Sequence, residues 1–194
     1  MSIEDIADLP PEEQTPELCL AAVKKYSWAL SYVRKKTPEL CLEAVKHHGR
    51  ALRYIREKTP EMCLIAVTKD GRALEHVKEQ TPEICLAAAK QRGEALEHVK
   101  EQTPEICLAA VKQSARALYY VEKKTPELYL AAVKKDGLEL RHIKDQTLAI
   151  CLAAVKENKR ALRYVESNLV HFVLVLVIKV RQLFKKDKAN EQEN

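Results

Sequence analysis

Glycine and aromatic residues are scarce in this chain of 194 residues, and neither sign of charge dominates it. Only 4 glycines and 5% aromatic residues are present, which disfavours a turn-rich all-β fold because its turns need many residues with positive φ. The longest apolar run, residues 169–178, is shorter than the about 20 residues of a transmembrane helix. The formal net charge is only +5, and a hydrophobic content of 46% excludes a disordered chain.

Cysteine is also too sparse for one class of protein. Six cysteines in a chain of this length do not make a disulfide-stapled mini-protein. A secretory signal peptide begins with basic residues that an apolar stretch follows. The first residues of this chain are acidic instead, so we expect no secretory signal peptide. The abundant residues are alanine, leucine, glutamate, lysine and arginine, which favour helix. The composition therefore predicts a soluble helical protein.

A strict internal repeat of 22 residues organises residues 15–168. The segment TPELCLAAVK at Thr15–Lys24 recurs with small changes and without insertions in six further units, which begin at Thr37, Thr59, Thr81, Thr103, Thr125 and Thr147. A fixed period of this size is typical of a solenoid. Positions within a unit are numbered below from its threonine, which is position 1.

The start of each unit has the features of a helix N-terminus. Thr15 is a suitable N-cap, Pro16 fits the first helical turn, and Glu17 favours the positive end of the helix dipole. The spacing predicts a first helix from Pro16 to about Lys25. All four glycines of the chain lie at position 13, where they predict the end of that helix or a turn.

A second helix is predicted after the turn, for example from Arg50 to Lys58. Its apolar residues Ala51, Leu52 and Ile55 have the i, i+3, i+4 spacing of one buried stripe. Helices this short are not stable alone, so each unit must pack against its neighbours. The prediction is an all-α solenoid of seven 22-residue α-hairpin repeats, about 60–70 Å long at the usual spacing of packed helices.

The two ends differ from the repeats. Residues 1–14 are acidic, and the helical spacing of Ile3, Ile6 and Leu9 predicts an N-terminal half-unit that caps the stack, with a frayed polar terminus as the alternative. Residues 169–186 predict an apolar C-terminal capping helix, with a strand as the alternative because many of them are β-branched. Residues 187–194 are expected to form a disordered tail.

The C-terminal helix carries more apolar surface than a terminal cap needs. Either the last unit covers its second apolar side, or that side is a homodimer interface, a partner site or a membrane-surface contact. The residues predicted for self-association or membrane contact are Phe172, Val175, Leu176, Ile178 and Lys179.

No residue pattern predicts catalysis, a metal site or a cofactor. The cysteines all lie at position 5, about one layer apart, whereas a disulfide needs Cα atoms within about 7 Å. There is no Cys-x-x-Cys pair for zinc, so we interpret them as packing residues in a reducing, cytoplasmic compartment. His76, His98 and His142 share position 18 with tyrosines and are interpreted in the same way. We expect a protein that is not an enzyme and has no small-molecule substrate.

Positions 14 and 17 vary from unit to unit and should project from one surface. Their charge is basic in unit 2, mixed to acidic in units 3 and 4, and basic again in units 5 and 7, which suits a protein partner. Nucleic acid is disfavoured because these positions lack a sustained positive stripe with stacking aromatics. A surface that serves solubility alone is the competing interpretation. The predicted partner-binding residues are Arg50, Arg53, Arg72, Glu75, Glu94, Glu97, Arg116, Tyr119, Arg160 and Arg163.

The repeated motif, Thr-Pro-Glu-Leu-Cys-Leu-x-Ala-Val-Lys followed by Gly-x-Ala-Leu-x-Tyr, is clearest at Thr37–Ile55. It resembles a bacterial and protist helical repeat family of unknown function, many of whose members belong to intracellular bacteria that inject effectors into host cells. The resemblance covers residues 15–168 and implies an α-helical repeat module, an effector-like role and translocation into a host cell. It implies no catalytic residues. Unit 7 departs from the motif, with Leu148 and Ala149 in place of Pro-Glu.

Overall fold

The structure is a computed structural model, which describes residues 6–7, 9–170 and 172–178. Within these residues each unit folds as an α-helix followed by a short 3₁₀ helix, and there is no strand. The α-helices are α1 (Pro16–Lys25), α2 (Pro38–His47), α3 (Pro60–Lys69), α4 (Pro82–Gln91), α5 (Pro104–Gln113), α6 (Pro126–Lys135) and α7 (Leu148–Glu157). The 3₁₀ helices are η3 (Ser27–Ser31), η4 (Gly49–Tyr54), η5 (Gly71–His76), η6 (Gly93–His98), η7 (Ala115–Tyr120), η8 (Gly137–His142) and η9 (Lys159–Tyr164).

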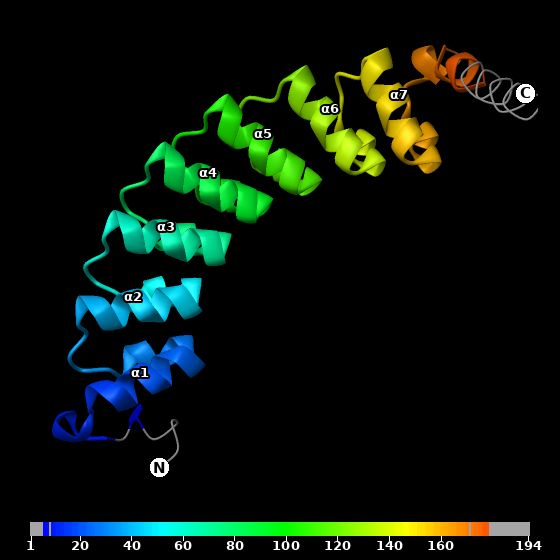
Figure 1. The fold of residues 1–194 in the computed structure, drawn as a ribbon. Coiled ribbons are helices and arrows are strands. Elements are labelled where there is room, and N and C mark those ends of the chain that lie inside the picture. The colour runs from blue at the N-terminus through cyan, green and yellow to red at the C-terminus, as the bar shows by residue number, and fades with distance from the viewer. Residues whose placement is uncertain (1–5, 8, 171, 179–194) are drawn as a thin grey trace, which may run out of the picture.

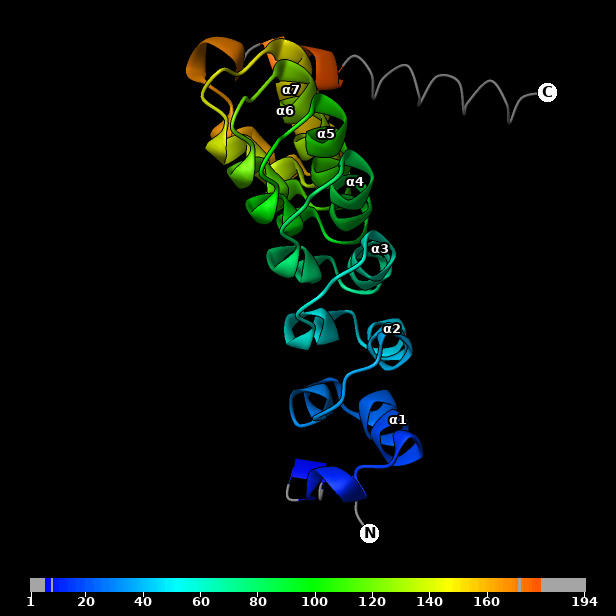
Figure 2. The same ribbon diagram turned by 90° about the vertical axis from the view of Figure 1, so that its left-hand side faces the viewer.

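The seven units stack side by side into an arc (Figure 1). The α-helices form one layer and the 3₁₀ helices another, which the turned view separates (Figure 2). From η3 to η8, each 3₁₀ helix packs against the α-helix of its own unit and against that of the next. The linkers between units run along the convex edge of the arc, and the tight turns from α-helix to 3₁₀ helix lie along its concave edge (Figure 1). The predicted all-α solenoid is confirmed.

The first helix of each unit has the bounds that its sequence predicts. α1 runs from Pro16 to Lys25, and the hydroxyl of Thr15 accepts a hydrogen bond from the backbone N–H of Leu18 at 3.3 Å. All seven threonines make this cap. α7 begins at the same position although Leu148 replaces the proline. The threonine cap, which satisfies one free donor of the first turn, therefore suffices to fix where each helix begins.

The second helix is a 3₁₀ helix, so the predicted α-helix from Arg50 to Lys58 is wrong in type and length. η4 covers only Gly49–Tyr54. Its first hydrogen bond runs from the Ala51 N–H to the His48 carbonyl, at 2.8 Å. The chain leaves the helix at Ile55, whose backbone is extended (φ −98°, ψ 127°) and whose side chain is buried. Because the chain turns into extended backbone at the buried Ile55, the helix before it has only six residues. Helices this short commonly have 3₁₀ geometry.

One hydrophobic core runs the length of the stack. In the α-helices it is built from positions 4, 5, 8 and 9, and in the second half of each unit from positions 15, 16 and 19. Alanine fills positions 8 and 15 in nearly every unit, and its small side chain lets the two layers approach closely. In unit 3 the core residues are Met62, Cys63, Ala66, Val67, Ala73, Leu74 and Val77.

The glycines at position 13 lie in the predicted turn, but for a different physical reason than a left-handed helix end. No described residue has positive φ. A Cβ on Gly71 would lie 2.8 Å from the carbonyl oxygen of Ala88 and 2.9 Å from Cβ of Arg92, both in the next unit. A Cβ on any of the other three glycines would lie still closer to the equivalent carbonyl oxygen of the next unit. Glycine is therefore needed because two backbones meet at the concave edge.

Glutamines at position 11 join consecutive turns along the concave edge. Gln91 accepts a hydrogen bond from the backbone N–H of Gly71 at 2.7 Å and donates one to the Lys69 carbonyl at 3.3 Å. Gln113 makes the same two bonds to Gly93 and Gln91, one unit further on. The concave edge is thus held together by side-chain bonds as well as by the close backbone approach.

Glutamines at position 22 join the units at the convex edge. Gln102 donates a hydrogen bond to the Tyr120 carbonyl at 2.8 Å and accepts one from the Glu122 backbone N–H at 3.1 Å. Gln80 and Gln146 repeat this pair of bonds. Where lysine takes the position, as in units 2 and 5, its ammonium instead binds a carbonyl of its own unit. Position 22 therefore decides which neighbouring units are bridged here.

Residues before the first repeat close one end of the stack. Ile6 is 1% exposed and belongs to the core, and the short 3₁₀ helix η2 (Pro11–Glu13) follows it. Gln14 donates to the Tyr32 carbonyl at 3.2 Å and accepts from the Arg34 backbone N–H at 3.0 Å, as the position-22 glutamines do. Ile3 lies outside the described residues.

At the other end, residues 167–170 and 172–178 are helical, so the helix begins two residues before the predicted start at 169. Val173 is fully buried against the last unit, and Leu169, Val170 and Val177 pack on the core. The predicted strand alternative is therefore wrong for these residues. The predicted continuation of the helix from 179 to 186 and the predicted tail at 187–194 lie outside the described residues.

Gly71→Ala is expected to destabilise the chain by about 1–3 kcal/mol, because the new Cβ meets a backbone carbonyl that cannot move without shifting α4. Urea unfolding followed by helical circular dichroism measures this. Ala115→Gly, at the same position of unit 5, is the matched control and should change stability by less than about 1 kcal/mol. Equal midpoints for Gly71→Ala and the unaltered chain would contradict the role assigned to the close approach.

Candidate functional site

The predicted partner-binding residues at positions 14 and 17 all lie on the 3₁₀ layer, within η4 to η7 and η9. Nine of the ten are exposed, and Glu94 is partly buried. The structure therefore places them on one layer of the solenoid, spread over its length rather than gathered at one point. This arrangement suits an extended contact and not a compact pocket.

Position 14 reaches across to position 12 of the next unit. The guanidinium Nε of Arg50 lies 3.9 Å from a carboxylate oxygen of Asp70. The Ser114 hydroxyl donates a hydrogen bond to the Glu94 carboxylate at 2.7 Å. Burial raises the pKa of Glu94, but the bonds from Ser114 and its own backbone, with Arg92 nearby, outweigh it and lower the pKa overall. Some position-14 side chains thus also connect adjacent units.

Two arginines at position 17 lie over the tyrosine rings of position 18. The guanidinium of Arg53 is 5.2 Å from the ring centroid of Tyr54, and Arg163 is 5.9 Å from Tyr164. These cation–π contacts hold the two arginines against the surface while they stay exposed. In unit 5 the position holds Tyr119, which is 52% exposed, its ring edge-on to that of a histidine in η8 at 5.2 Å.

The predicted self-association residues differ in exposure. Phe172 is 58% and Ile178 is 52% exposed, whereas Val175 and Leu176 are only partly exposed. Leu174, which was not predicted for this role, is also exposed. Lys179 lies outside the described residues. Among the described helices, none is long and apolar enough to cross a membrane.

The cysteines are buried in the core and are not bonded to one another. Burial raises the pKa of every thiol, which disfavours the reactive thiolate. The thiols of Cys85, Cys107 and Cys151 point to the side-chain oxygen of the position-22 glutamine before them, at 3.4–3.6 Å. The described residues contain no group of three or more metal-ligating side chains placed to hold an ion.

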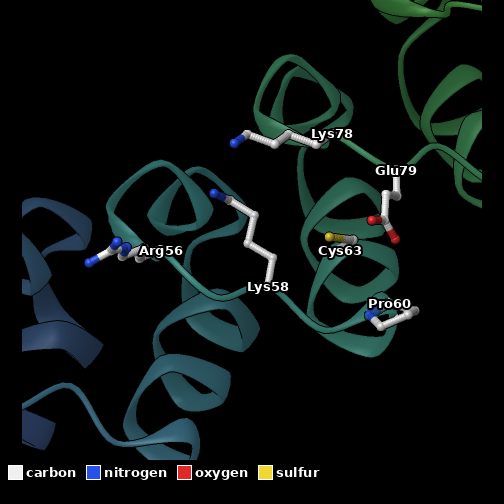
Figure 3. Close-up of a pocket in the computed structure, with 6 residues that line it drawn as sticks. All are labelled: Arg56, Lys58, Pro60, Cys63, Lys78 and Glu79. Atoms are coloured by element: carbon white, nitrogen blue, oxygen red, sulfur yellow. The ribbon is translucent and has the colours of Figure 1, made fainter.

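Small clefts open beside these cysteines along the convex edge. The cleft at Cys63 has a volume of about 180 Å³, and Lys58, Lys78 and Glu79 surround its opening (Figure 3). Equivalent residues line further clefts at Cys41, at Cys85 and at the cysteine of unit 5. Because the clefts repeat with the units, they follow from the stacking and do not single out one place in the chain.

The repeat itself matches a known family model. The model described as "Domain of unknown function (DUF4116)" matches residues 15–59 and, one unit later, residues 37–81. Units 1 to 3 thus match the DUF4116 model. The shift between the two matches equals the period of 22 residues, and the later units carry the same motif. No curated protein and no solved structure matches the chain. The resemblance seen in the sequence is thus confirmed, and the DUF4116 description names no ligand or partner.

Unit 6 breaks the repeat pattern of this chain inside the core. Position 15 is a buried alanine in the six other units and is Glu139 here, with only 3% of its surface exposed. Its Oε2 is the one buried side-chain oxygen or nitrogen among the described residues without a hydrogen-bond partner. The 3₁₀ layer is also interrupted at this point, since η7 and η8 have little contact while the other neighbours in the layer pack together. Glu139 is therefore a local cost to the stack.

Glu139→Ala is expected to stabilise the chain by about 1–3 kcal/mol, because it removes a buried carboxyl whose Oε2 has no hydrogen-bond partner and restores the alanine of the other units. Chemical unfolding of the full chain measures the change. Glu97→Ala, an exposed glutamate, is the control and should change stability by less than about 0.5 kcal/mol. The reverse change Ala95→Glu should destabilise unit 4. A destabilised Glu139→Ala variant would show that the carboxyl supports the fold.

Proposed function

We propose that this protein is a non-enzymatic helical-repeat scaffold that binds a protein partner along its 3₁₀ layer. The observation that carries the proposal is the contrast between the core and the surface. Core positions repeat almost without change, whereas the exposed positions 14 and 17 differ from unit to unit in size and charge. A solenoid offers such positions as one extended surface. Specificity then comes from which side chain each unit presents.

The charge order along this surface supports a protein partner. Unit 2 presents two arginines, unit 4 two glutamates and unit 7 two arginines again. A complementary order of charges on a partner would fix its register on the scaffold and disfavour other partners. The resemblance to repeat proteins of intracellular bacteria supports an effector-like role. In that role the protein is delivered into a host cell and binds its partner there through the same surface.

Reversal of charge in one unit is expected to weaken partner capture without loss of helicity. The variants are Arg50→Glu with Arg53→Glu in unit 2, and Arg160→Glu with Arg163→Glu in unit 7. Affinity capture from host-cell lysate with mass spectrometry should find proteins that the unaltered chain retains and that these variants lose. Lys123→Glu with Lys144→Glu, at exposed linker positions, is the control of equal charge. Unchanged yields with both arginine variants would contradict the proposed surface.

A second candidate function, self-association through the C-terminal helix, is favoured by one observation. Phe172, Leu174 and Ile178 are exposed at the end of the described stack. Exposed apolar side chains grouped on one helix are typical of an interface. The same residues could contact a membrane surface, and the measurement below separates the two.

The self-association candidate predicts a dimer that Leu174→Glu with Ile178→Glu dissociates. Sedimentation velocity of the full chain measures the oligomeric state, and flotation with anionic vesicles measures membrane contact. Ser167→Glu with Asn168→Glu adds the same charge at exposed polar positions of the same helix and should leave the dimer intact. A monomer that does not float would exclude both forms of this candidate.

A further inference from the structure

The concave edge of the arc is strongly basic. We define the inner edge as positions 10–14 of the seven units, where each α-helix turns into its 3₁₀ helix (Figure 1). It has four acidic residues, so its net charge is +11, against +5 for the whole chain, and every unit contributes a positive excess. Its fifteen basic residues are Lys24, Lys25, Lys46, Arg50, Lys69, Arg72, Lys90, Arg92, Lys112, Arg116, Lys134, Lys135, Lys156, Lys159 and Arg160.

The inner edge is continuous in space. A ring nitrogen of His48 lies 3.0 Å from the Lys24 carbonyl of the preceding unit. Ion pairing links Arg50 to Asp70, and the glutamines of position 11 link the turns of units 3, 4 and 5. Because neighbouring turns are bonded directly from unit 1 to unit 5, the basic side chains of these units form one surface along the arc and not separate patches.

Most of this positive charge has no acidic partner among the described residues. Of the fifteen basic side chains, only Lys46, Arg50 and Arg92 lie within 4 Å of a carboxylate of the residues that the structure describes. Fourteen of the fifteen residues are exposed; Arg92 is partly buried. Like charges brought together on a concave edge repel one another, and an acidic ligand would relieve that repulsion.

Helix stability explains only part of the pattern. A lysine at position 10 lies in the last turn of an α-helix, where the helix dipole favours a cation. Position 14 is different, because it lies in the first turn of the 3₁₀ helix, at the end where backbone N–H groups disfavour a cation. Arg72, Arg116 and Arg160 occupy it and are exposed, and no carboxylate in the described part of the chain lies within 4 Å of them. Their charge therefore points outward to a ligand and not to the fold.

We propose that the inner edge binds an acidic polypeptide segment in extended form. This inference rests on the proposed function and names the chemistry of the partner. The four acidic residues Asp70, Glu94, Asp136 and Glu157 interrupt the positive charge. A polypeptide can place neutral residues opposite them, whereas the uniform phosphates of a nucleic acid cannot. The inner edge has one tyrosine, Tyr26, and one tryptophan, Trp28. Their rings stack on each other with centroids 5.3 Å apart.

The spacing of the units also suits an extended peptide. Packed layers recur about every 8–10 Å, and an extended chain advances about 3.3 Å per residue. One acidic residue in about every three would then meet each unit in turn. A peptide of about 20 residues spans the whole edge at this rise, so a fluorescein-labelled peptide of that length with repeating Glu-Glu-Gly is a suitable probe.

The test measures fluorescence anisotropy of this peptide with the full chain at several salt concentrations. The unaltered chain should bind it, with affinity that falls as salt screens the charges. Arg72→Glu, Arg116→Glu and Arg160→Glu combined should weaken binding at least about tenfold. Unit 4 already carries Glu94 at this position, so the fold accepts the change. The control combines Lys78→Glu, Lys123→Glu and Lys144→Glu at exposed linker positions, with the same net charge, and should weaken binding less than about threefold.

Three outcomes would overturn the inference. The first is failure of the unaltered chain to bind the peptide. The second is an equal loss of affinity in the two triple variants. The third is tighter binding of a DNA duplex of the same length than of the peptide. The proposed function is tested apart from this by the position-17 arginines Arg53 and Arg163, which lie outside the inner edge. Loss of capture when these two are reversed, together with no peptide binding, would leave the scaffold function standing and reject the acidic partner.

Discussion

The structure depends on one contact, the approach of the backbone at position 13 to the carbonyl at position 8 of the next unit. A Cβ on Gly71 would lie 2.8 Å from the Ala88 oxygen, so the close approach seen at the four glycines is open only to a residue without a side chain. Unit 5 carries Ala115 at the same position. The contact lies on one edge, where glutamine bonds such as that of Gln91 to Gly71 reinforce it. The linkers on the opposite edge are longer, and the stack therefore curves toward the tight turns (Figure 1).

The same contact organises the surface. The turns lie along one concave edge, whose positions 10–14 carry a net charge of +11, and from unit 1 to unit 5 each turn is bonded to the next. The 3₁₀ helix that follows each turn presents position 17 on the adjoining face, where Arg53 and Arg163 rest on tyrosine rings. The regular core thus supports a surface whose composition is free to differ between units, as expected of a binding scaffold.

The sequence alone predicts the first half of each unit well, since Thr15 and Pro16 are local signals whose physics does not depend on neighbours. It does not predict the helix type of the second half, because that depends on burial of Ile55 between units. The glycines were placed correctly in the turn, but only the structure shows that they meet a carbonyl from another unit.

Two features were visible in the sequence and were missed. Glu139 interrupts a column of alanines, which an alignment of the units against one another makes plain. The lysine of position 10 recurs in six units, yet its meaning appears only once the turns are known to share one edge. The bridging role of Gln102 was not predictable, because its partners Tyr120 and Glu122 lie in the next unit.

Small-angle X-ray scattering of the full chain tests most directly whether the close approach at position 13 sets the curvature. The comparison is between the unaltered chain and a variant with alanine in place of all four glycines, each checked for helicity by circular dichroism. Wider spacing at the concave edge should straighten the arc, so the variant should have the larger maximum dimension. A variant that keeps its helicity and gives the same scattering profile as the unaltered chain would contradict the account.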